Sequence, residues 1–143
     1  MGAVFETALG GKSGLPDMGP YHAECRVLAL SNGQFTFSGA MYAGVSAQIG
    51  PMALLEILDD EANVCVVVGS KRCQCLDQEI FTHIGVDPEK MKILAVKSTV
   101  HFRDDFEPIA DLILHAQSPG VNYCSLETIP YRNLRPNVRR GPE

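Results

Sequence analysis

The sequence has no apolar run long enough to cross a bilayer and no surplus of positive charge. A membrane-spanning helix needs about 20 consecutive apolar residues, and none of the apolar stretches here approaches that length. The N-terminus lacks the basic region and apolar run of a secretory signal peptide, so we expect a cytoplasmic protein without a membrane partner. The formal net charge of −5 also argues against nucleic acid, because phosphate binding needs clustered cations.

Common metal-binding and catalytic motifs are missing as well. Cys73-Gln74-Cys75 has C-x-C spacing rather than the C-x-x-C of zinc sites, and no second Cys or His pair lies at ligand spacing. Neither H-E-x-x-H nor G-x-S-x-G occurs. Five cysteines without a secretory signal indicate reduced thiols, and Cys65, inside an apolar run, is expected in the core. We therefore expect no metal in this chain and no complete catalytic set.

What is present suits one ordinary globular domain. The chain has 143 residues, of which 45% are hydrophobic and 20% charged. A chain of this length buries roughly 68–70% of the surface that its unfolded form exposes, which is enough for a core. We expect a single domain over residues 1–143, with about the last 20 residues forming an irregular tail. The one basic cluster lies in that tail and is read as solvated: Arg132, Arg135, Arg139 and Arg140.

Alternating and continuous apolar patterns predict two hairpins. Residues 25–30 and 34–38 flank Asn32-Gly33, the strongest short hairpin signal. Residues 52–58 and 64–68 flank a charged turn, and the continuous apolar run at 64–68 is typical of a central strand buried on both faces. Residues 42–49 are read as a loop. Three more strands are predicted, at residues 4–9, 93–96 and 112–116.

Helix signals separate some of these strands. Residues 77–84 read as a helix with Asp77 as N-cap and Gly85 as its stop, and Asp87-Pro88 starts a short helical turn. Residues 102–109 carry apolar side chains at helical spacing. Strands, hairpins and a few helices together predict an α/β (mixed α+β) fold, in which helices pack on a mixed sheet.

The strongest candidate site follows the predicted strand at 93–96. In open α/β sheets, ligands bind just past the carboxyl ends of strands. Lys97, Ser98, His101 and Arg103 offer an ammonium, a hydroxyl, an imidazole and a guanidinium, which suit a carboxylate, a phosphate or a developing oxyanion. In the structural alternative, Ser98 caps the helix, His101 is a surface residue and Arg103 forms an ion pair.

A glycine-rich turn near the start is a second candidate. Gly10-Gly11-Lys12-Ser13-Gly14 can direct backbone N–H groups at an anion, with Lys12 adding charge. It is not a P-loop, because the G-x-x-x-x-G-K-[ST] spacing is absent. A plain tight turn is the structural alternative.

Several motifs, taken in order, resemble one known family. The sequence is similar to the carboxy-terminal domain of the microcystinase C (MlrC) family of metallopeptidase-like proteins over about nine tenths of its length. The motifs that carry this resemblance are Leu9-Gly10-Gly11-Lys12, Asn32-Gly33, Gly85-Val86-Asp87-Pro88, Lys97-Ser98-x-x-His101-Phe102-Arg103, Phe106-x-Pro108-Ile109-Ala110, Pro119-Gly120 and Arg135-Pro136.

The resemblance implies one domain of a zinc-dependent hydrolase that acts on peptides. The zinc ligands of this family lie in a larger amino-terminal domain, so zinc and that domain are the implied cofactor and partner, and this chain alone is expected to be inactive. A small peptide or another carboxylate-bearing molecule is the implied substrate. Two alternatives remain: a stand-alone module that binds small anions, and a structural module that forms homo-oligomers. The implied substrate-anchoring residues are Gly10, Gly11, Lys12, Lys97, Ser98, His101 and Arg103, with Lys97 and His101 as candidates for oxyanion stabilisation or proton transfer.

Overall fold

A computed structural model describes residues 1–12, 14, 18–58, 63–116, 118 and 125–141. Its main feature is a four-stranded antiparallel sheet in the order β1-β2-β5-β6, accompanied by a two-stranded sheet of β3 and β4. The strands are β1 (Val4–Leu9), β2 (Tyr21–Ser31), β3 (Gln34–Thr36), β4 (Ser46–Gln48), β5 (Met52–Ile57) and β6 (Cys65–Gly69).

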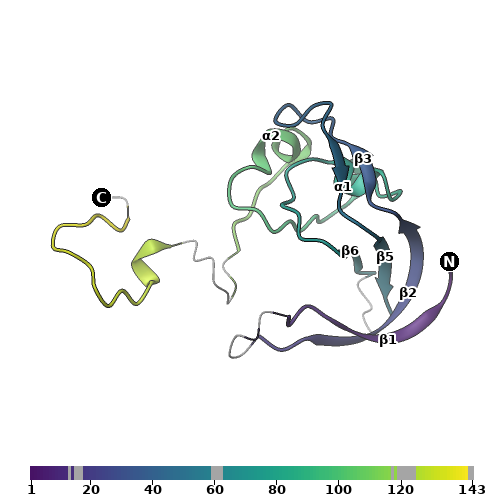
Figure 1. Ribbon diagram of the computed structural model, residues 1–143, viewed down its shortest axis with the longest axis horizontal. Helices are drawn as coiled ribbons and strands as arrows, with labels where there is room; N and C mark the ends of the chain where they lie inside the picture. Colours follow the sequence, from purple (N-terminus) through teal and green to yellow (C-terminus); the bar gives the residue numbers. More distant parts are fainter. Residues whose placement is uncertain (13, 15–17, 59–62, 117, 119–124, 142–143) are drawn as a thin grey trace.

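The helices in the described residues are short, and all of them follow the last strand in the chain. They are α1 (Glu79–Thr82), η1 (Pro88–Lys90), α2 (Arg103–Phe106), η2 (Glu107–Ile109) and η3 (Leu126–Thr128). Figure 1 shows a strongly curved sheet, with α1 and α2 gathered near β3 at one end and the segment with η3 lying away from the sheet. The predicted mixed α/β class is confirmed. Among the described residues, no helix is long and apolar enough to span a bilayer.

The core of the sheet follows from the alternation of side chains along β2. Ala23 and Cys25 are buried, while their neighbours in sequence are exposed. They pack with Leu55 and Ile57 of β5, an inner strand that pairs with both β2 and β6. On the other face, Arg26 and Glu56 form an ion pair at 2.8 Å. The partly buried hydrophobic residues around this core are Leu9, Val27, Ala53, Val66 and Val68.

The hairpin predicted around Asn32-Gly33 is wrong in its pairing. The strand before the turn pairs with β1 and β5, whereas β3 pairs with β4, so the predicted loop at residues 42–49 contains a strand. A type I′ turn needs positive φ at both central residues. Here Gly33 has φ +68°, whereas Asn32 is not among the positive-φ residues; its side chain accepts a hydrogen bond from the Gln34 N–H at 3.0 Å instead. The turn therefore redirects the chain into the second sheet.

The second hairpin is confirmed, but its apolar strand lies elsewhere than predicted. β5 and β6 pair in antiparallel register, with Leu55 opposite Val66. β6 is an edge strand rather than a central one, and Cys65 is exposed rather than part of the core. An apolar run indicates that a strand can be buried, but the strands on either side of it determine whether it is buried. The turn predicted at 59–63 lies mostly outside the described residues.

Two predicted strands are absent from the described structure. Residues 93–96 and 112–116 are irregular, and three of their side chains are largely exposed: Ile93 at 88%, Leu112 at 74% and Leu114 at 81%. β-Propensity reflects packing against neighbouring strands. These two segments have apolar, β-prone side chains but no strand beside them. The candidate site is therefore not at the end of a strand.

The helical predictions hold in part. The helix predicted at 77–84 is shorter, since α1 spans Glu79–Thr82 and its N-cap is Gln78 rather than Asp77. Asp77 nevertheless accepts a hydrogen bond from the Glu79 N–H at 2.8 Å, and Gly85 has φ +88° just past the helical segment. Asp87 caps η1 as predicted. Residues 102–109 form α2 and η2 rather than one continuous helix, and the buried rings of Phe102 and Phe106 hold this segment in place.

Candidate functional site

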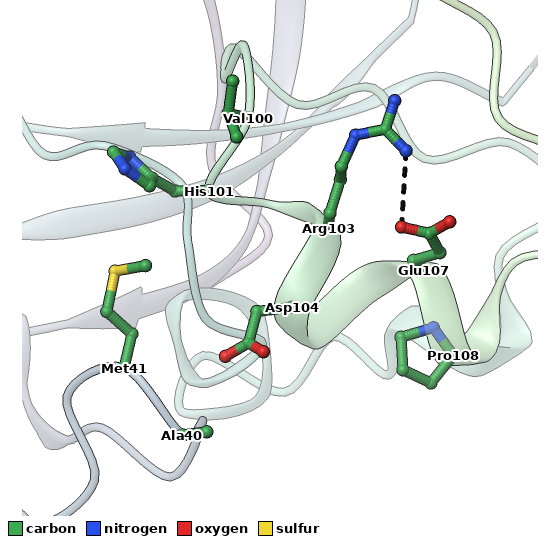
Figure 2. Close-up of a pocket in the computed structure, with 8 residues that line it drawn as sticks. All are labelled: Ala40, Met41, Val100, His101, Arg103, Asp104, Glu107 and Pro108. Carbon is green, nitrogen blue, oxygen red and sulfur yellow. Dashed lines mark hydrogen bonds and ion pairs between the residues drawn. The ribbon is translucent and has the colours of Figure 1, made fainter.

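An open hollow of about 790 Å³ lies between the turn after β3 and the α2–η2 segment. In Figure 2, Met41 and His101 lie at one side, Arg103 and Glu107 at the other, and Asp104 between them. The hollow therefore contacts two of the predicted site residues, His101 and Arg103, and two carboxylates. Its lining is completed by apolar or small residues: Ala40, Met41, Val100 and Pro108.

His101 is held by a side chain from the C-x-C segment. Gln74 Nε2 lies 2.9 Å from His101 Nδ1 and 3.4 Å from Ser98 Oγ. When the Gln74 amide donates to Nδ1, the neutral imidazole carries its proton on Nε2. The ring can then donate a hydrogen bond to an anionic ligand through that nitrogen.

Arg103 has three contacts, all of them weak or exposed. Nη1 lies 3.3 Å from Glu107 Oε2, Nη2 lies 2.9 Å from His115 Nε2, and the guanidinium lies 5.6 Å from the centre of the Phe102 ring. An exposed i,i+4 ion pair contributes only about 0.3–0.5 kcal/mol. A ligand carboxylate can therefore replace Glu107 at small cost. The ion pair with Glu107 is also what the structural alternative predicts for Arg103, with no ligand involved.

Hydrogen bonds to two carboxylates connect the segments that form the walls of the hollow. Asp77 is fully buried, and its Oδ1 and Oδ2 accept hydrogen bonds at 2.8 Å from the N–H groups of Glu79 and Gly39. The Asp105 carboxylate accepts a short bond from the Gln78 N–H, and the Gln78 side chain donates to the Asp105 carbonyl at 2.7 Å. These bonds connect α1 both to α2 and to the turn that carries Met41.

Gly39 is the point where the two carboxylates come closest to the turn. A Cβ at this position would lie 3.0 Å from Asp77 Oδ2 and 3.2 Å from Asp105 Oδ1. These distances are tighter than most real Cβ contacts, and the neighbours are buried or hydrogen-bonded. A side chain at residue 39 would therefore push apart the two walls of the hollow.

Burial and crowding of negative charge raise two pKa values behind the hollow. Burial, followed by the charges of Asp77, Asp104 and Glu79, raises the pKa of Asp105, while the bond from the Gln78 N–H opposes the rise. Burial, with smaller contributions from Cys73, Asp77 and Asp105, raises the pKa of the Cys75 thiol to about 12. Cys75 is therefore a neutral thiol rather than a nucleophile.

The glycine-rich turn lies elsewhere in the molecule. Gly10 and Gly11 have φ +68° and +65° in the connection from β1 to β2. A Cβ on Gly11 would lie 2.4 Å from the Pro20 nitrogen, so close backbone approach explains this glycine. Figure 1 places that connection at the opposite end of the sheet from α2. Within this chain, Gly10, Gly11 and Lys12 do not join His101 and Arg103, and Lys97 and Ser98 are outside the lining of the hollow.

Several residues of the site carry no recognisable signal in the sequence. Met41 and Gln74 come from two separate segments, and only the folded chain places them near His101 and Arg103. Glu107 could have been noted as an acidic residue at i,i+4 spacing from Arg103. In the part of the chain that is described, no group of three or more His, Cys, Asp or Glu could hold a metal ion.

Comparison with known proteins gave one match. Residues 1–133 match the family model described as the MlrC C-terminus. The curated proteins and the solved structures gave no match.

Proposed function

The chain belongs to the MlrC C-terminus family, and from this premise we propose that it forms the substrate-binding wall of a zinc-dependent peptide or amide hydrolase. The observation that carries the proposal is the open hollow in which His101 and Arg103 lie beside apolar side chains. Binding sites typically combine an apolar lining with a few polar groups that fix the orientation of the ligand. We further propose that the protein acts in the cytoplasm.

In this proposal, the chain binds the substrate, and the amino-terminal domain cleaves the bond. The proposal assigns the zinc to the amino-terminal domain of an MlrC-type protein, as the resemblance to that family implies. Arg103 holds a substrate carboxylate with its planar guanidinium, and His101, oriented by Gln74, donates a second hydrogen bond. Lys97 and Ser98 extend the site toward the amino-terminal domain, where they contact the rest of the substrate.

The glycine-rich turn has a place in this proposal only through the partner domain. Gly10, Gly11 and Lys12 would contact substrate if the amino-terminal domain spans the concave side of the sheet. Substitution of Lys12 by alanine in the two-domain assembly then raises KM. An unchanged KM would assign the turn a purely structural role.

Titration of the 143-residue protein with N-acetylglycine, a simple carboxylate, tests the site. We expect saturable binding that Arg103→Ala abolishes and that Arg132→Ala, a matched change in the exposed tail, leaves unchanged. Removing a charged hydrogen-bond partner costs about 1.5–3 kcal/mol, or roughly 10- to 150-fold in affinity. The absence of saturable heat for the unmodified protein would overturn the carboxylate site.

Activity measurements test the domain assignment. With zinc added, the chain alone is expected to hydrolyse no peptide, whereas mixing it with the amino-terminal domain of an MlrC protein should give turnover. Turnover by the 143-residue chain alone would contradict the division of labour. Turnover by the amino-terminal domain at an equal rate without this chain would contradict its role in binding substrate.

A second candidate function is that of an interaction module. The exposed apolar side chains of Ile93, Leu112 and Leu114 favour a surface that another protein covers. If a second copy covers it, light scattering will show a dimer that Leu112→Ser with Leu114→Ser converts to monomer. If the amino-terminal domain covers it, the chain alone will be a monomer, and the same double substitution will weaken binding of that domain.

A further inference from the structure

We propose that the hollow recognises a zwitterion, specifically a free α-amino acid with an apolar side chain. This inference rests on the proposed function and narrows it, because such an amino acid is a product of peptide hydrolysis. The hydrolase step adds one water across the amide bond, which leaves a new carboxylate on one fragment and a new amine on the other. An amino acid released from the end of a peptide therefore carries both charged groups on one carbon atom.

The charges around the hollow suit a zwitterion better than a simple anion. Four of its eight lining residues are titratable. Arg103 and His101 can donate hydrogen bonds to an anionic group, and the carboxylates of Asp104 and Glu107 can accept them from a cationic group. A ligand with only a carboxylate would bind Arg103 but would lie close to two like charges. A ligand with only an amine would face the guanidinium. A zwitterion satisfies both kinds of group at once.

The existing ion pair offers a route for the exchange of partners. Arg103 and Glu107 meet at 3.3 Å, with 44% and 53% of their side chains exposed. The ligand carboxylate can take over the guanidinium, and the ligand ammonium can take over the carboxylate that is released. Asp104, which lies between the two sides in Figure 2, then adds a second acceptor for the ammonium. No charge loses its partner during binding.

The apolar part of the lining accounts for the choice of side chain. Met41 is 45% exposed and Val100 is 60% exposed, although both are large hydrophobic residues. Together with Ala40 and Pro108 they line the hollow alongside the charged groups. An aliphatic ligand side chain that covers them removes apolar surface from water on both partners. The unbranched thioether of Met41 can adjust to side chains of different shape.

Four small ligands separate the contributions. L-leucine carries both charges and an apolar side chain, N-acetyl-L-leucine lacks the ammonium, L-leucinamide lacks the carboxylate, and glycine lacks the side chain. In titrations of the 143-residue protein, we expect L-leucine to bind about tenfold or more tightly than each of the others. Each charged hydrogen bond contributes about that much, and burial of a leucine side chain, which glycine lacks, contributes a similar amount.

Variants of the acidic residues sharpen the test. In the double variant Asp104→Asn with Glu107→Gln, the affinity for L-leucine should fall to that for N-acetyl-L-leucine in the unmodified protein. Glu6→Gln, an exposed change on β1 away from the hollow, serves as the matched control and should leave both affinities unchanged. Circular dichroism checks that each variant is folded.

The outcomes distinguish the inference from the function on which it rests. Equal or tighter binding of N-acetyl-L-leucine would overturn the zwitterion proposal and leave the carboxylate site intact. Tighter binding of L-leucinamide would overturn both the zwitterion proposal and the role of Arg103. Equal binding of glycine and L-leucine would overturn the apolar preference. If none of the four binds, the hollow is not a site for carboxylates and the proposal fails with it.

Discussion

The sheet half of the molecule and the site half are built in different ways. From β1 to β6, long antiparallel ladders enclose a core around Cys25 and Leu55. From residue 70 to residue 116, the regular elements are single helical turns, and their arrangement depends on a few buried rings and on the bonds of Asp77 and Asp105. The sheet ladders repeat backbone hydrogen bonds along whole strands, whereas the site half has little regular structure and few buried contacts. We therefore expect the site half to be the less stable of the two.

The largest expected effect comes from the sheet core. Leu55→Ala removes a buried side chain of the inner strand β5 and should lower the free energy of unfolding by about 2–5 kcal/mol. Leu30→Ala, at a position of the same sheet that is 67% exposed, should change it by less than about 0.5 kcal/mol. Urea denaturation measures both. Equal effects would mean that the sheet core does not hold the fold together.

A smaller effect, confined to the other half, is expected from Asp77→Ala. It removes the acceptor of two part-buried hydrogen bonds, from the N–H groups of Gly39 and Glu79, at a cost of about 0.5–1.5 kcal/mol each. Hydrogen exchange should show faster opening of residues 77–106 and unchanged protection of β2 and β5. Loss of protection throughout the sheet would show that the two halves unfold together.

The sequence predicts the sheet half better because its signals are local. The alternation along β2 and the hairpin of β5 and β6 are both visible in the order of residues. The errors arise where neighbouring strands determine the structure of a segment. The apolar run at 64–68 predicts a central strand but forms an edge strand, and the β-prone segment at 93–96 forms no strand because no strand pairs with it. Which strand lies beside another depends on the packing of distant segments, and the order of residues alone does not contain it.

The site shows the same division between local and distant information. His101 and Arg103 are predicted from their chemistry and lie together in the hollow, yet the strand that was expected to position them does not exist. The sequence predicts Asp77 as the helix N-cap; the N-cap of α1 is Gln78, but Asp77 does accept the Glu79 N–H. Its second bond, to Gly39, crosses 38 residues and has no counterpart in the sequence pattern. The chemistry of the site residues is predictable from the sequence, whereas the contacts that position them are not.

The pH dependence of stability offers a milder test of the site half. The pKa of Asp105 is raised in the folded protein, so the folded state binds this proton more tightly than the unfolded state. The carboxylate therefore destabilises the fold at pH values above its folded pKa, and this penalty disappears as the pH falls toward the unfolded value. Asp105→Asn keeps an acceptor for the Gln78 N–H and removes the charge. We expect it to be more stable than the unmodified protein at pH 7 and to lose the advantage at lower pH, as measured by urea denaturation; a constant difference would contradict this origin.

The smallest expected effect concerns the reactivity of Cys75, which reports on the closure of the site half without disturbing it. Its thiol has a pKa of about 12, raised first by burial, whereas Cys73 is exposed and its pKa is raised less. Because the thiolate is the reactive form, iodoacetamide at pH 8 should alkylate Cys75 about tenfold or more slowly than Cys73, as followed by peptide mass spectrometry. Asp77→Ala should speed the alkylation of Cys75 and leave that of Cys65, on the edge strand β6, unchanged. If Cys65 also reacted faster, opening of the site half would extend into the sheet, and the two halves would have to be treated as one cooperative unit.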